Sequence, residues 1–82
     1  MASQEVLRVH EPNLLLDALI DEAGMSHDGL AARVNRLGER YGLTLLYDHA
    51  SVRRWIRDHT IPRGQVPELI CEVLSERRRA VA

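Results

Sequence analysis

The amino-acid sequence predicts an all-α fold, a compact domain of four or five helices. Apolar residues recur at the three- and four-residue spacing of one helix face in four separate segments. Glycine, proline or a helix-capping residue separates each segment from the next. The chain has 82 residues, enough for one domain, and only 4% of them are aromatic. We therefore expect a single core built from Leu, Val, Ile and Ala.

The domain is expected to span residues 13–76, after a flexible N-terminal arm at 1–12. Its first helix is expected to begin near Asn13 and to end at Gly24, because glycine favours the conformation that stops a helix. The apolar stripe of this helix comprises Leu15, Leu16, Leu19, Ile20 and Ala23. Its predicted outer surface is acidic and comprises Asp17, Asp21 and Glu22.

The second helix is expected to begin after Ser26, which can cap it, with Asp28 in the first turn. Its apolar stripe comprises Leu30, Ala31, Val34, Leu37 and Tyr41. Gly38 interrupts this stripe, and Gly42 is expected to end the helix. The segment 43–47 is short and apolar, which fits either an extended connector or a very short strand.

The third helix is expected to be capped by Asp48 and to run to about Asp58. With about 100° between successive residues, this helix has two distinct sides. The side expected to pack on the domain comprises Val52, Trp55, Ile56 and His59. The opposite side comprises Ala50, Arg53, Arg54 and Arg57. Trp55 is therefore expected in the core rather than as a stacking platform for a single-stranded base.

The fourth helix is expected to include Pro67 in its first turn, where proline is tolerated. Its buried residues are expected to be Leu69, Ile70, Val73 and Leu74. We expect the helix to end before a polar C-terminal tail at 77–82. Cys71 lies beside Ile70 on a mostly apolar helix, so we expect a buried or half-buried, unreactive thiol.

The basic residues, all eleven of which are Arg, are concentrated in the middle of the chain. Residues 1–30 contain one Arg and six acidic residues, whereas residues 31–64 contain seven Arg and three acidic residues. This asymmetry indicates a polyanionic partner. The Arg side chains of the third helix could bond guanine edges or phosphates in a DNA major groove. The alternative is that they form only a solvated face.

Three short motifs are similar to those of a known DNA-binding family. They are Ser26-His27-Asp28-Gly29-Leu30-Ala31, Val52-Arg53-Arg54-Trp55, and Pro62 seven residues beyond the Trp. Together they resemble the Cro/C1-type (lambda-repressor-like) helix-turn-helix domains, in the form found in actinobacterial transcriptional regulators. The resemblance covers about residues 13–76. Leu30 and Val52 are 22 residues apart, so the connection between the two motif helices is enlarged.

The resemblance implies a role for each helix and for particular side chains. The helix at 14–24 is the support, that at 27–37 crosses the DNA backbone, and about 49–57 form the recognition helix in the major groove. The implied base contacts are His49, Ala50, Ser51, Arg53 and Arg57. The implied phosphate contacts are His27, Arg33, Arg36, Arg54 and Arg63. DNA binding further requires Arg33 and Arg36 to join the arginines of the third helix in one positive surface. Asp58, where the family often has Gly, adds a negative charge beside it.

We expect a sequence-specific double-stranded DNA-binding protein that acts as a cytoplasmic transcriptional regulator, as a homodimer or within a larger regulator. The alternative is a helical protein-interaction module that pairs through its acidic first helix and does not bind DNA. Nothing in the sequence indicates an enzyme, a cofactor, a metal site or a small-molecule substrate, because no catalytic grouping, phosphate-binding glycine loop or metal-ligand spacing of His residues is present. No apolar run approaches the roughly 18 residues of a membrane helix.

Overall fold

The computed structural model describes residues 13–81, which form four α-helices. The helices are α2 (Leu14–Glu22), α3 (His27–Arg40), α4 (His49–Asp58) and α5 (Val66–Val81). No strand occurs within this part of the chain. The predicted all-α class with four helices is confirmed, whereas the arm predicted at 1–12 lies outside the described residues.

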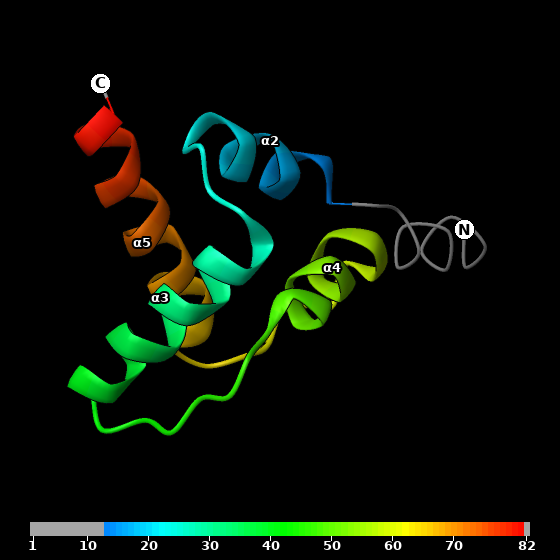
Figure 1. The fold of residues 1–82 in the computed structure, drawn as a ribbon. Coiled ribbons are helices and arrows are strands. Elements are labelled where there is room, and N and C mark those ends of the chain that lie inside the picture. Colours follow the sequence, from blue (N-terminus) through cyan, green and yellow to red (C-terminus); the bar gives the residue numbers. More distant parts are fainter. Residues whose placement is uncertain (1–12, 82) are drawn as a thin grey trace.

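The long helix α3 is central to the packing. It contacts both α4 and α5, and α2 contacts the same two helices. Figure 1 shows α5 on one side of the molecule and α4 on the other, with α3 between them. The core comprises Leu16, Ile20, Ala23, Leu30, Ala31, Val34, Leu37, Val52, Trp55, Val66, Leu69, Ile70, Val73 and Leu74. All of these except Trp55 are aliphatic, as the composition predicts.

Polar side chains fix where the helices begin. The Asn13 side chain accepts a hydrogen bond from the Leu16 backbone N–H at 3.1 Å, and Ser26 Oγ accepts one from the Gly29 N–H at 2.9 Å. Each bond satisfies a backbone donor that the first turn of a helix leaves unpaired. The predicted Ser26 cap is confirmed. Gly24 follows α2 with φ +65°, so it ends the helix as predicted.

The connection between α3 and α4 comprises residues 41–48 and contains an extended segment. Asn35 holds this segment on α3, because its side chain donates to the Tyr47 carbonyl at 2.9 Å and accepts from the Tyr47 N–H at 3.0 Å. Gly38 is buried, and a Cβ built on it would lie 2.5 Å from Leu45 Cδ1. The glycine expected only to interrupt the stripe therefore makes room for Leu45. Of the two predicted conformations, the segment 43–47 takes that of a connector.

Two apolar side chains of the first two helices lie outside the core, contrary to prediction. Leu15 is 71% exposed. The core face of α2 is centred near Leu16 and Ile20, and Leu15 lies about 100° around the helix from Leu16. Tyr41 is 55% exposed because α3 ends at Arg40, so the helical periodicity no longer directs its side chain inward.

Three predictions for the last two helices, those for His59, Cys71 and the C-terminal tail, are also wrong. His59 is exposed because it adopts a left-handed conformation, φ 55°, at the end of α4, which turns it away from the apolar side. Cys71 is exposed because α5 buries the opposite face. The tail predicted at 77–82 is helical as far as Val81. Arg and Glu are good helix formers, and Arg77 Nε donates to the Ala23 carbonyl at 3.2 Å, which ties α5 to the end of α2.

Candidate nucleic-acid interface

The start of α4 is fixed by a reciprocal pair of hydrogen bonds. The Asp48 carboxylate accepts from the Ser51 N–H at 3.0 Å, and Ser51 Oγ accepts from the Asp48 N–H at 3.3 Å. This capping box confirms the predicted Asp48 cap. The hydrogen bond from the Ser51 backbone stabilises the carboxylate and lowers the pKa of Asp48. The helix therefore begins at a defined residue, which sets the direction of every side chain that follows.

The apolar side of α4 is anchored in the core. Val52 is fully buried and Trp55 is 3% exposed, so the predicted core role of Trp55 is confirmed. The Tyr47 ring meets Trp55 edge to face, with 5.0 Å between ring centroids. The Asn13 N–H also donates to the Ile56 carbonyl at 2.6 Å, which joins the beginning of α2 to α4. These contacts prevent α4 from rotating and fix its outward side.

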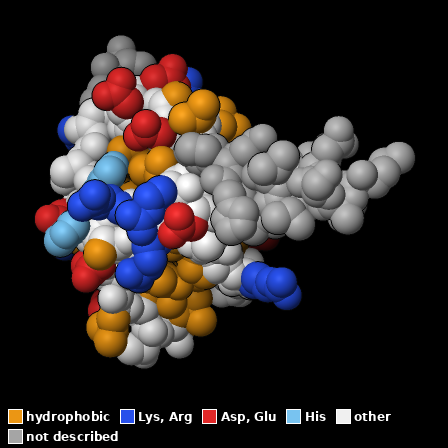
Figure 2. All heavy atoms as spheres, turned by 90° about the vertical axis from the view of Figure 1, so that its right-hand side faces the viewer, with side chains coloured by type: hydrophobic (Ala, Val, Ile, Leu, Met, Phe, Trp, Pro, Cys, Tyr) orange, Lys and Arg blue, Asp and Glu red, His pale blue; other side chains and the backbone are white. Residues whose placement is uncertain are grey.

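The outward side of α4 presents three exposed guanidinium groups, those of Arg53, Arg54 and Arg57, which we call the α4 face. Figure 2, which views the α4 end of the molecule, shows Arg side chains gathered with His side chains beside them and acidic side chains around the edge. Arg57 Nε donates to the Asp58 carboxylate at 3.3 Å, so part of its charge is already compensated. Neither Arg53 nor Arg54 makes a salt bridge to any residue in 13–81.

His27 lies next to the α4 face, as its implied phosphate contact requires. It is half-buried at the start of α3, and it lines one hollow together with Arg53 and Arg57. Asp17 of α2 lines the same hollow. From the sequence, Asp17 was expected only on the acidic outer surface of α2, because the packing of α2 beside α4 has no local sequence signal. The hollow therefore combines two arginines, one histidine and one carboxylate.

His49 and Asp28 link the beginnings of α4 and α3. His49 Nδ1 lies 3.2 Å from Asp28 Oδ1, and the His49 N–H donates to the same oxygen at 3.2 Å. His49 is exposed, and Ala50, next to it, is half-buried. Both implied base contacts therefore lie at the accessible start of α4. The link to Asp28 was not predicted, because the two residues are 21 positions apart.

Ser51 does not belong to the accessible surface, contrary to the implied base contact. Ser51 is 7% exposed, and its hydroxyl forms hydrogen bonds with Asp48. A hydroxyl used in this way positions the helix and cannot also reach a base edge. The spacing Asp48-x-x-Ser51 at the start of a helix is the sequence signal that indicates this role.

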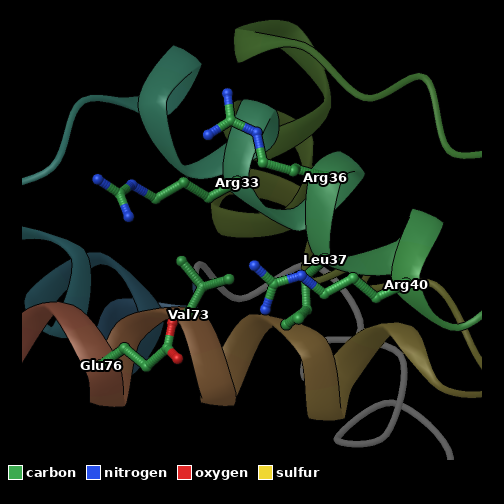
Figure 3. Close-up of a pocket in the computed structure, with 6 residues that line it drawn as sticks. All are labelled: Arg33, Arg36, Leu37, Arg40, Val73 and Glu76. Atoms are coloured by element: carbon green, nitrogen blue, oxygen red, sulfur yellow. The ribbon is translucent and has the colours of Figure 1, made fainter.

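The implied phosphate contacts Arg33 and Arg36 line a different hollow from that of Arg53 and Arg57. Together with Arg40 they line a hollow between α3 and α5, shown in Figure 3, whose other lining residues are Leu37, Val73 and Glu76. One continuous positive surface that joins these arginines to the α4 face stays a prediction. The helical period places Arg33, Arg36 and Arg40 on one side of α3. Arg63 is exposed in the turn between α4 and α5.

No group of three or more His, Cys, Asp and Glu side chains in the described part of the chain is placed to hold a metal ion. Among its helices, none has both the length and the apolar character needed to cross a membrane.

Comparison with known proteins gives one match. A family model described as the SP15 N-terminal domain matches residues 16–81, which includes nearly all of the four helices. None of the curated proteins and none of the solved structures compared with the chain matches it. The resemblance to Cro/C1-type domains is not part of the family match and stays a prediction.

Proposed function

We propose that this chain, which belongs to the SP15 N-terminal domain family, binds double-stranded DNA through the α4 face and acts as a transcriptional regulator. One observation supports this most strongly: Val52 and Trp55 anchor one side of α4 while all three of its arginines are exposed on the other. A helix is about 10–12 Å across and fits a major groove. In this proposal, α3 and α4 act as a helix-turn-helix pair with an enlarged connection.

The positions of the arginines suggest different contacts for each. Arg53 and Arg57 are four residues apart, so they lie on the same side of α4 and line the same hollow. Both are therefore assigned to base edges. Arg54 lies about 100° further around the helix, toward the flank, where a phosphate of the groove edge passes. His27 is assigned to a phosphate beside Arg53, because it shares the hollow of Arg53 and Arg57.

Two carboxylates reduce the positive potential of the proposed interface. Asp58 pairs with Arg57, and Asp17 lines the hollow beside it. A helix of ten residues also spans only a few base pairs. One copy is therefore expected to bind weakly, and useful affinity requires two half-sites, supplied by a homodimer or within a larger regulator.

The proposal is tested by affinity measurements on matched variants. Duplexes are first selected from a random pool with the unmodified protein, and binding is then measured by fluorescence anisotropy. Arg53→Ala/Arg57→Ala is expected to lose about 1–3 kcal/mol for each bidentate base contact and to discriminate poorly between selected and random duplexes. Arg54→Ala is expected to weaken binding to both duplexes equally.

The matched control is Arg78→Ala/Arg79→Ala, which removes the same charge from exposed positions on α5. The control is expected to keep most of the affinity and all of the sequence discrimination. Equal losses in the two double variants would mean that binding depends on overall charge alone, and the α4 assignment would then be wrong.

A further inference from the structure

Three arginines of α3 that the proposed DNA contact does not use, Arg33, Arg36 and Arg40, line the hollow between α3 and α5. Figure 3 shows Arg40 extending over α5, with Glu76 on α5 below it, and Arg36 pointing away from α5. Although Glu76 lines the same hollow, no salt bridge within 4.0 Å joins any of the three arginines to an acidic residue of the described chain. These arginines, which we call the α3 stripe, therefore retain donors for an external carboxylate or phosphate.

The outward face of α2 has the opposite character. Leu14 and Leu15 are 70% and 71% exposed, and Asp21 and Glu22 are exposed at the other end of the same helix. No basic residue lies in α2. Within residues 13–81, the α2 face is thus an exposed helix surface that combines apolar and acidic side chains.

The two surfaces match in charge and in length. The α2 helix has nine residues and is about 13 Å long, while the α3 stripe spans seven residue steps, or about 10 Å. If α2 of one copy lies along the stripe of another, Asp21 and Glu22 come within reach of guanidinium groups, which bind carboxylates with two parallel hydrogen bonds. The exposed leucines then cover the methylene stems of the arginines, which are apolar.

We propose that the α3 stripe is the docking surface for the α2 face of a second copy of this chain. Each copy has one of each surface, so a twofold-symmetric pair forms two identical contacts. Neither contact uses Arg53, Arg54 or Arg57, so the α4 face of each copy stays accessible. The inference concerns self-association and is independent of DNA binding.

The test measures self-association without DNA by sedimentation equilibrium, over a range of protein concentrations. The variant Arg36→Glu/Arg40→Glu reverses two charges of the stripe, and Asp21→Arg/Glu22→Arg reverses two charges of the α2 face. Each variant alone is expected to associate more weakly by on the order of tenfold or more, because like charges then meet. Mixed in equal amounts, the two variants are expected to associate as strongly as the unmodified chain, since every contact then joins opposite charges.

The control Arg78→Glu/Arg79→Glu reverses two exposed charges of α5 outside the stripe and is expected to keep the dimer. Circular dichroism of each variant shows that the helices have formed. The proposal is overturned if the unmodified chain stays monomeric, or if the mixture associates no better than its components. A monomeric chain whose affinity for a duplex falls in Arg36→Glu/Arg40→Glu would instead assign the stripe to DNA phosphates.

Discussion

Replacing Asp58 with Asn is expected to strengthen DNA binding, because Asp58 competes with the duplex for Arg57. Arg57 Nε lies 3.3 Å from Asp58 Oδ1, and the two side chains are 68% and 45% exposed. Asn keeps the size of Asp and can still accept a hydrogen bond, but it has no charge. The substitution therefore frees the charge of Arg57 for the duplex and changes little else.

The effect of Asp58→Asn on folding is expected to be small, because two contributions oppose each other. An exposed ion pair stabilises a protein by about 0–1 kcal/mol. Asp58 is the last residue of α4, where a negative charge interacts unfavourably with the helix dipole and destabilises the fold by about 0.3–1 kcal/mol. Their difference should change the free energy of unfolding by less than about 0.5 kcal/mol. A change in DNA affinity can then be attributed to the interface.

The expected gain in DNA binding follows from the release of Arg57, whose full charge can then act on the duplex. A released ion pair of about 1 kcal/mol corresponds to about fivefold in affinity. The freed charge also steepens the fall of log K against log salt concentration, by at most the value of about 0.9 that one neutralised phosphate adds. Fluorescence anisotropy titrations with a labelled duplex at several salt concentrations measure both quantities.

The matched control for Asp58→Asn is Glu72→Gln, which removes the same charge from an exposed position on α5. This control separates a local effect from a change in net charge. If both variants raise the affinity and the salt dependence equally, Arg57 does not contact the duplex and the reasoning is refuted.

The α4 cap, Gly38 and Cys71 give further predictions. Folding lowers the pKa of Asp48, so its cap stabilises the protein fully at pH values above the ordinary pKa of Asp. This stability is lost as the pH falls through the lowered pKa. The thermal unfolding midpoint should therefore drop in acid, and it should drop less in Asp48→Asn. Gly38→Ala places a Cβ 2.5 Å from Leu45 Cδ1 and should cost about 1–3 kcal/mol in urea unfolding, with less than additive loss when combined with Leu45→Ala. Cys71 is exposed and should react with a thiol reagent nearly as fast in the folded protein as in urea; strong protection would contradict its position.

The features predicted correctly from the sequence are those that depend on neighbouring residues. The caps at Ser26 and Asp48 are bonds between residues three positions apart, so the local sequence contains both partners. The burial of Val52 and Trp55 with exposure of Arg53 follows from the helical period of one short segment. These features are enough to identify α4 and its basic side.

The features that the sequence could not predict depend on how the helices pack on one another. Arg33 and Arg36 line a hollow together with Val73 and Glu76 of α5, which was not predicted, because α3 has two partners and its sequence does not specify which flank faces which. Gly38 was interpreted as an interruption because its contact with Leu45 requires the connection to fold back on α3. Long-range packing therefore decides which of the arginines can act together.

The most direct test of the proposed function is an NMR titration of the ¹⁵N-labelled chain with a duplex selected from a random pool. The account predicts that the side-chain signals of Arg53 and Arg57 and the backbone amides of 49–57 shift together, while those of the α3 stripe change little at the same protein concentration. Shifts confined to the α3 stripe or the α2 face, with α4 unaffected by saturating duplex, would contradict it.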